Sequence, residues 1–314
     1  MATLAQVETG LHAALVSDDP LVAEAARHLF DAGGKRFRPL LVAICAQFGE
    51  YGRPEIISAA EVVELTHLAT LYHDDVMDEA LLRRGAPSAN ARWDNSVAIL
   101  VGDFLFARAA EVAAQLGTEA VRIQARTFSR LVHGQIAETV GPRDAAPVEH
   151  YLHVLAEKTG SLMATSARFG AMFAGAPQDQ VEALARYGEA MGIAFQLSDD
   201  LLDIASESPQ SGKTPGTDLR EGVATLPVLY ALASDDDDLA SVRLRKLLAD
   251  GPLTDGQRHA EALTLLRESA ALGQARETVR GYAERARAEL SPLPDTPARR
   301  ALESLCAIIA DRTS

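Results

Sequence analysis

The chain of 314 residues carries 30 Lys and Arg against 44 Asp and Glu, a formal net charge of −14. That balance argues against a nucleic-acid surface and a polybasic membrane patch, so an anionic ligand must be held by a few concentrated cations. No apolar run is long enough to cross a bilayer, the N-terminus shows no signal-peptide pattern, and Cys45 and Cys306 lie in apolar runs without metal-type spacing. These features predict a cytoplasmic protein with buried thiols.

The first part of the chain predicts helices separated by a cationic loop. Ala, Leu, Glu and Arg dominate and alternating apolar runs are scarce, which favours helix throughout. Asp19-Pro20 is typical of a cap followed by the first helical residue, and Gly33-Gly34 of the end of that helix. The loop Lys35-Arg36-Phe37-Arg38-Pro39 then opens a second apolar helix.

A helix from about Glu55 to Glu79 is apolar on most of its circumference, which is the pattern of a buried helix. It carries His67 and ends on Asp74-Asp75-Val76-Met77-Asp78, followed by Arg83-Arg84-Gly85. Three carboxylates stand there at the negative pole of the helix, where cations are favoured instead. We expect further helices at Val97 to Leu116, Thr118 to Val140, Pro147 to Ala174 and Gln178 to Ala205.

A second aspartate cluster, Asp199-Asp200-Leu201-Leu202-Asp203, lies at the end of the helix 178–205. A Gly- and Pro-rich loop from Ser211 to Asp218 follows, and amphipathic helices continue from Val223 to the C-terminus. We find no linker, low-complexity segment or clear repeat. The sequence therefore predicts a single all-α domain over residues 1–314.

Carboxylates at positions i and i+4 lie on the same face of a helix, so Asp74 stacks with Asp78 and Asp199 with Asp203. Burying like charges is costly unless a cation compensates, and clustered carboxylates suit a hard ion such as Mg²⁺. Several Mg²⁺ ions together with several Arg and Lys residues fit a diphosphate ligand. The chain has no Gly-rich phosphate loop, which argues against a P-loop NTPase.

Each of these features also has an ordinary structural explanation. One aspartate cluster alone could be a solvated helix end, whereas two clusters inside apolar helices favour a metal site. His67 could be a buried structural histidine, but it lies seven residues before Asp74 on the same face, which favours a ligand role. We expect Asp103 to be a buried structural acid, and Asp235 to Asp238 to be a solvated loop or cap.

The motifs quoted above, together with Lys158-Thr159, Phe195-Gln196 and Gly212-Lys213, resemble those of the all-trans polyprenyl diphosphate synthases from Gly33 to about Arg312. The resemblance implies an all-α isoprenoid-synthase fold around a deep central cavity, usually as a homodimer. It also implies Mg²⁺-assisted departure of diphosphate from an allylic substrate. The double bond of isopentenyl diphosphate then attacks the resulting cation, and a proton is lost.

Carried over by position, the resemblance implies metal binding by Asp74, Asp78 and Asp199 as principal ligands, with Asp75, Asp200 and Asp203 secondary. It implies that isopentenyl diphosphate is held by Lys35, Arg38, His67 and Arg84. The allylic diphosphate would be held by Arg83, Lys158, Lys213 and Gln196, with Thr159 beside Lys158. Short-chain members often carry a second lysine where this chain has Gly222-Val223, and we expect Arg220 or water to replace it.

Product length is predicted from the places four and five residues before Asp74, where short-chain members commonly carry an aromatic residue. Here these places are Thr70 and Ala69, which predicts a medium- or long-chain product, heptaprenyl to decaprenyl, such as a quinone side chain. The alternatives are a shorter-chain geranylgeranyl or farnesyl diphosphate synthase, a class I terpene cyclase and a non-catalytic subunit of a heteromeric synthase. Cyclases usually have a different second metal motif, and a non-catalytic subunit tolerates loss of aspartates that are all present here.

Overall fold

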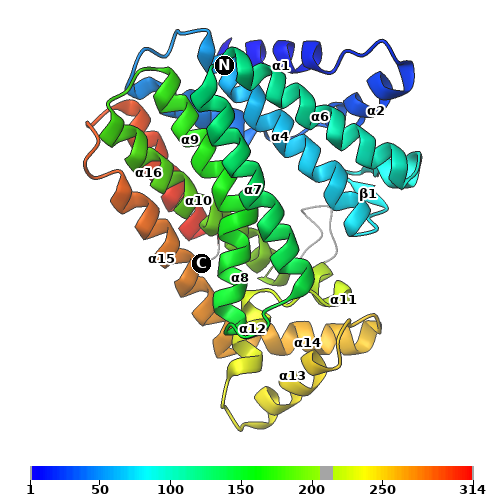
Figure 1. Cartoon of the computed structure of the whole chain (residues 1–314). Coiled ribbons are helices and arrows are strands. Elements are labelled where there is room, and N and C mark those ends of the chain that lie inside the picture. The colour runs from blue at the N-terminus through cyan, green and yellow to red at the C-terminus, as the bar shows by residue number, and fades with distance from the viewer. Residues whose placement is uncertain (1, 206–214, 313–314) are drawn as a thin grey trace. The chain divides into compact units, whose positions relative to one another are not determined.

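The structure, a computed structural model, describes residues 2–205 and 215–312 and is almost entirely helical, which confirms the predicted fold class (Figure 1). The helices up to the first aspartate cluster are α1 (Ala2–Ala14), α2 (Pro20–Asp31), α3 (Phe37–Cys45), the 3₁₀ turn η1 (Ala46–Phe48) and α4 (Glu55–Met77). A short hairpin of β1 (Leu82–Arg83) and β2 (Ala86–Pro87) follows α4.

The middle of the chain forms α5 (Ala89–Arg92), α6 (Asn95–Gln115), α7 (Thr118–Val140), α8 (Pro147–Leu155), the π-helical turn η2 (Ala156–Gly160), α9 (Ser161–Phe173) and α10 (Gln178–Ala205). The last part forms α11 (Thr217–Glu221), α12 (Leu226–Ala233), α13 (Leu239–Ala249), α14 (Gly256–Glu268), α15 (Ala270–Glu289) and α16 (Pro297–Asp311). Helices α7 and α10 begin and end at the predicted residues. The predicted helix 147–174 is instead interrupted by η2.

The described chain divides into two compact units, each assembled from separate stretches. Unit 1 comprises Met1–Arg130, Leu162–Gly188 and Pro292–Ala298, and unit 2 comprises Leu131–Ser161, Glu189–Ser291 and Arg299–Ser314. Neither unit is a continuous segment, and each is described by itself below. The single domain over residues 1–314 stays a prediction.

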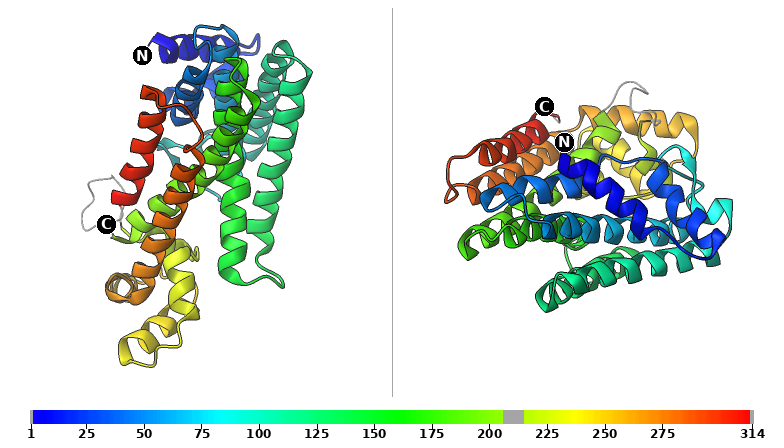
Figure 2. Two further views of the ribbon diagram at one scale, coloured as in Figure 1. Left: turned by 90° about the vertical axis from the view of Figure 1, so that its left-hand side faces the viewer. Right: turned by 90° about the horizontal axis from the view of Figure 1, so that it is seen from above.

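Helix α4 is the centre of unit 1 and packs against α1, α3, α5 and α6. Figures 1 and 2 show α4 and α6 side by side. Residues on every face of α4 are buried, as its apolar circumference predicted: Ile56, Ala59, Ala60, Val62, Val63, Glu64, Leu65, Thr66, Leu68, Ala69, Tyr72 and Asp75. Because neighbours surround it, α4 holds the aspartates at its C-terminal end on a rigid support.

The contact between α1 and α4 partly covers a carboxylate, the side chain of Glu61. A methyl group placed on Gly10 of α1 would lie 1.7 Å from Oε1 of Glu61, so the glycine leaves room for this side chain. Burial raises the pKa of Glu61 to about 7. Between about pH 4.5 and pH 7, the carboxyl group of Glu61 therefore keeps its proton in the folded protein, whereas in the unfolded chain it has released it.

We expect the free energy of unfolding to fall as the pH rises from about 4.5 to about 7, because Glu61 must then ionise inside the fold. Glu61→Gln should remove that dependence and stabilise the protein at pH 8 by about 1–2 kcal/mol, a value reduced for partial solvent access. Thermal unfolding at pH 5 and pH 8 measures both effects. A variant no more stable than the original protein at pH 8 would contradict this prediction.

In unit 2, α12 packs against α8, α13, α14 and α15. Asp238 caps α13, because its side chain accepts hydrogen bonds from the backbone N–H of Ala240 at 2.9 Å and of Ser241 at 3.1 Å. The prediction of a solvated cap is thus confirmed there. Cys45 of unit 1 and Cys306 of unit 2 are buried and are not joined in a disulfide, which confirms the prediction of buried thiols. No helix within residues 2–205 and 215–312 has the length and apolar character needed to cross a membrane.

Candidate active site

The first aspartate cluster occupies the last turn of α4 and its cap. Asp74 is half-buried, and its carbonyl accepts a hydrogen bond at 2.8 Å from the N–H of Asp78, the exposed C-cap residue. Asp75 is fully buried, and its Oδ1 accepts a hydrogen bond from Nε of Arg83 at 2.6 Å. Burial raises the pKa of Asp75, while Arg83 opposes that shift. Of the three side chains, Asp75 is therefore buried, and Asp74 and Asp78 are more accessible to solvent.

The motif Arg83-Arg84-Gly85 forms the turn of the β1–β2 hairpin. Arg83 pairs with Ala86 across the hairpin, which leaves Arg84 and Gly85 as the two loop residues. Their φ values of 55° and 77° fit the turn type that matches the twist of a two-residue hairpin, and glycine adopts it without strain. The hairpin thus directs two adjacent arginines to different partners.

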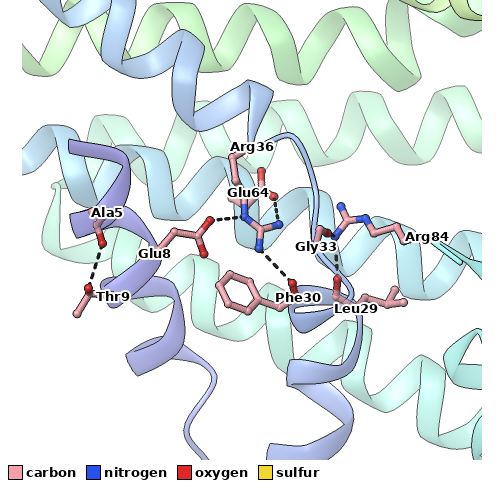
Figure 3. Close-up of polar contacts among 9 residues, drawn as sticks. All are labelled: Ala5, Glu8, Thr9, Leu29, Phe30, Gly33, Arg36, Glu64 and Arg84. Atoms are coloured by element: carbon pink, nitrogen blue, oxygen red, sulfur yellow. Dashed lines mark hydrogen bonds and ion pairs between the residues drawn. The ribbon is translucent and has the colours of Figure 1, made fainter. Parts of the chain in front are cut away.

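Arg84 reaches the loop between α2 and α3 (Figure 3). Its Nη1 donates hydrogen bonds to the backbone carbonyls of Leu29, at 2.8 Å, and Gly33. A methyl group on Gly34 would lie 3.1 Å from the guanidinium carbon of Arg84 and 2.9 Å from Nη1 of Arg36. Gly33, with a φ of 93°, therefore follows the end of α2, and Gly34 makes room for two guanidinium groups.

Arg36 and Glu64 form a buried ion pair that the sequence did not single out (Figure 3). Arg36 lies 3.2 Å from Oε1 of Glu64, whose side chain is only 2% exposed, and 2.7 Å from Oε1 of Glu8. Its guanidinium also stacks over the ring of Phe30 at 4.3 Å. The available signal was the single acid inside the apolar run Val62-Val63-Glu64-Leu65.

His67 lies among these arginines as a neutral imidazole. Burial lowers the pKa of His67 well below its usual value, and Arg38, Arg84, Arg36 and Arg83 add to that shift. Burial also lowers the pKa of Arg38, whose Nε is buried without a hydrogen-bond partner in the described residues. Lys35 is exposed in the loop before α3. Unit 1 thus gathers cations and a neutral imidazole donor, which is a set suited to an anion.

The other residues predicted on α4 and α6 differ in burial. Ala69 is fully buried, and Thr70 is half-buried with its hydroxyl donating to the carbonyl of His67 at 2.7 Å. Tyr72 turns toward α2, where its hydroxyl donates to the carbonyl of Ala25. The expectation that Asp103 is buried was wrong: its side chain is 62% exposed on α6, because this face of the helix is open to solvent.

The second aspartate cluster in unit 2 is held from within the unit. Oδ2 of Asp200 accepts a hydrogen bond from the hydroxyl of Tyr151, and Oδ1 accepts one from Nε2 of Gln196 at 3.0 Å. Burial raises the pKa of Asp200 to about 6, although both hydrogen bonds oppose the shift. Tyr151 was not predicted; its only signal was its place seven residues before Lys158, on the same helical face.

Asp199 and Asp203 have different partners. Oδ1 of Asp199 lies 3.2 Å from Nη2 of Arg312 on the chain after α16. Oδ2 of Asp203 accepts a hydrogen bond from the N–H of Asp218 at 3.1 Å, which ties α10 to the start of α11. Arg220 is exposed on α11 and Val223 follows it. Lys213 lies outside the described residues.

Lys158 and Thr159 lie in the π-helical turn η2 and are half-buried. Nζ of Lys158 contacts the carboxylate of Glu138 on α7. Lys158 is thus held by Glu138 and lies in the turn between α8 and α9. Turns of this kind occur frequently at functional sites.

The donor set in both clusters fits a hard divalent cation. All the candidate ligands are carboxylates, which are the oxygen ligands that Mg²⁺ and Ca²⁺ prefer. In unit 1, Oδ2 of Asp75 is buried and has no hydrogen-bond partner in the described part of the chain. Across residues 2–205 and 215–312, no three His, Cys, Asp or Glu side chains converge closely enough to hold a metal by themselves. Mg²⁺ typically completes its shell with water and substrate phosphates.

The sequence matches the family described as polyprenyl synthetase over residues 19–264. It is 53% identical over 306 residues to a nonaprenyl diphosphate synthase of Mycobacterium tuberculosis, covering 97% of this chain and 90% of that protein. Two solved structures resemble the fold with a TM-score of 0.90. One is a geranylgeranyl pyrophosphate synthase from Corynebacterium glutamicum, complexed with calcium and isoprenyl diphosphate, which is 48% identical and covers 100% of this chain and 96% of that chain. The other is a decaprenyl diphosphate synthase from Rhodobacter capsulatus, which is 36% identical and covers 100% of this chain and 97% of that chain.

Proposed function

This chain belongs to the polyprenyl synthetase family of prenyltransferases, and from that premise we propose that it condenses isopentenyl diphosphate onto an allylic diphosphate. The product is an all-trans polyprenyl diphosphate of medium or long chain, in the heptaprenyl to decaprenyl range. The observation that carries the proposal is the set of arginines around neutral His67, next to the aspartates of α4, in a chain of net charge −14. An anionic substrate requires such a local concentration of positive charge in a protein whose net charge is negative.

The two substrates are held by different cations in the proposal. Lys35, Arg38, His67 and Arg84 bind isopentenyl diphosphate, and the last three lie in one electrostatic neighbourhood of unit 1. Arg83, Lys158, Thr159, Lys213 and Gln196 serve the allylic diphosphate. The ion pairs of Arg83 with Asp75 and of Lys158 with Glu138 support this assignment, because each restrains the position of the cation.

Asp74, Asp78 and Asp199 are the principal Mg²⁺ ligands in the proposal, and Asp75, Asp200 and Asp203 are secondary ligands. When bound, the ions stabilise the negative charge that develops on the departing diphosphate. In the proposal, arginine and lysine side chains that are already in position stabilise the same negative charge. Little reorganisation is therefore needed as the allylic carbon–oxygen bond breaks. The isopentenyl double bond then attacks the allylic carbon, and the proton lost from the adduct passes to the released diphosphate.

We further propose a cytoplasmic homodimer. Ile99 and Leu100 on α6 are 44% and 66% exposed, an apolar surface that a second copy of the chain would cover. Cys45 and Cys306 are buried and form no disulfide, which suits a reducing compartment.

The test is to incubate the purified protein with isopentenyl diphosphate, a labelled allylic diphosphate and Mg²⁺, and to size the products. We expect chain elongation with release of diphosphate and products of seven or more isoprene units. Geranylgeranyl or farnesyl diphosphate as the end product would support a short-chain synthase. Cyclised hydrocarbon would support a terpene cyclase, and no turnover by the protein alone would support a subunit of a heteromeric enzyme.

A further inference from the structure

Two glycines let the π-helical turn η2 pack closely within unit 2: Gly134 of the neighbouring helix α7 and Gly160 of the turn itself. A methyl group on Gly134 of α7 would lie 2.8 Å from Cβ of Glu157, 2.8 Å from Cγ of Lys158 and 3.0 Å from the backbone nitrogen of Lys158. A methyl group on Gly160, at the end of the turn, would lie 3.2 Å from the carbonyl oxygen of Glu189 on α10. The turn therefore occupies space that ordinary side chains would fill.

The contact at Gly134 cannot be relieved easily. The atoms that would clash are a backbone nitrogen, a Cβ and a side-chain atom near the main chain, and none is the free end of a flexible side chain. A shift of η2 away from α7 would move Lys158 and Thr159 together. A tightly packed interior transmits such a displacement instead of absorbing it.

Gly134 is also unfavourable for the helix that carries it. It lies inside α7, and its φ is not among the positive values that require glycine. Glycine in a helix interior costs about 1 kcal/mol relative to alanine, so α7 alone would be more stable with Ala at this position. The close approach of η2 accounts for the absence of a side chain.

The same face of α7 also carries the partner of the lysine. Glu138, one helical turn after Gly134, contacts Nζ of Lys158 with its carboxylate. Gly134 thus sets how near the backbone of η2 approaches α7, and Glu138 holds the end of the side chain.

We propose that Gly134 is a positioning residue, which admits the π-helical turn against α7 and so places Lys158 toward the allylic diphosphate. This inference rests on the proposed function, because it assigns the diphosphate of the allylic substrate to Lys158. It adds that the lysine is positioned by a glycine on a different helix.

The test is Gly134→Ala in the full-length protein. We expect the KM for the allylic diphosphate to rise about ten- to a hundredfold, because a displacement near 1 Å at a binding group has effects of this size. The KM for isopentenyl diphosphate should stay unchanged, since its proposed ligands lie in unit 1. A variant with an unchanged KM for the allylic substrate would overturn the proposal while leaving the activity of the original protein, and hence the proposed function, intact.

Gly281→Ala is the matched control, because it makes the same substitution inside α15, where nothing lies within 4 Å of the added methyl group. It should raise the thermal stability and leave both KM values unchanged. The second measurement is Gly134→Ala combined with Lys158→Ala. If Gly134 acts through Lys158, the double variant should bind the allylic substrate no more weakly than Lys158→Ala alone; full additivity of the two losses would overturn the proposal.

Discussion

Replacing Asp74 with Asn should lower kcat by about 10²–10³-fold while leaving the fold intact. Asp74 is half-buried in the last turn of α4, and the amide has nearly the same shape as the carboxylate. The substitution removes the negative charge that is proposed to hold Mg²⁺. Steady-state kinetics with isopentenyl diphosphate, an allylic diphosphate and saturating Mg²⁺ measure the effect.

A measurement of binding separates this loss from a structural one. Mg²⁺ with inorganic diphosphate should raise the melting temperature of the original protein, because a ligand that binds only the folded state stabilises it. The shift should be much smaller in Asp74→Asn. Asp103→Asn, an exposed acid on α6 of the same unit, is the control and should change neither quantity. Asp74→Asn with normal kcat and a normal shift would exclude Asp74 as a ligand.

Most helices could be predicted because their apolar periodicity and their breaks agree. Helices α7 and α10 begin and end at the predicted residues, and α4 ends at Met77 instead of Glu79. The π-helical turn η2 could not be predicted, because a change in hydrogen-bond register leaves the apolar spacing of α8 and α9 unaltered. The turn packs closely against Gly134, which lies on another helix.

The sequence predicted the types of residue at the candidate site better than their partners. The spacing i, i+1, i+4 places the second aspartate of each cluster about 100° around the helix from the first. In both clusters a side chain from another element holds this second residue: Arg83 contacts Asp75, and Tyr151 contacts Asp200. The sequence indicated neither pair, because both partners lie on other elements.

Ala69→Phe should shorten the product to a short-chain length, which is the largest change in product that we expect from one substitution. Ala69 lies roughly 7–8 Å before Asp74 along α4, so a phenyl ring there would block a growing chain early. The site is fully buried, and overpacking should also lower stability by about 1–3 kcal/mol. Chromatographic sizing of labelled products measures the length, and thermal unfolding measures the stability.

The effect on length must be separated from overpacking, and α4 offers a matched position. Ala60 is also buried and lies nine residues before Ala69, about two and a half turns away and hence on the opposite face. Ala60→Phe should therefore lower stability to a similar extent and leave the product length unchanged. If both variants shorten the product, the cause is a general disturbance of α4. If Ala69→Phe does not fold, Thr70→Phe at the half-buried neighbouring position tests the same effect on product length, with Thr70→Val as its isosteric control.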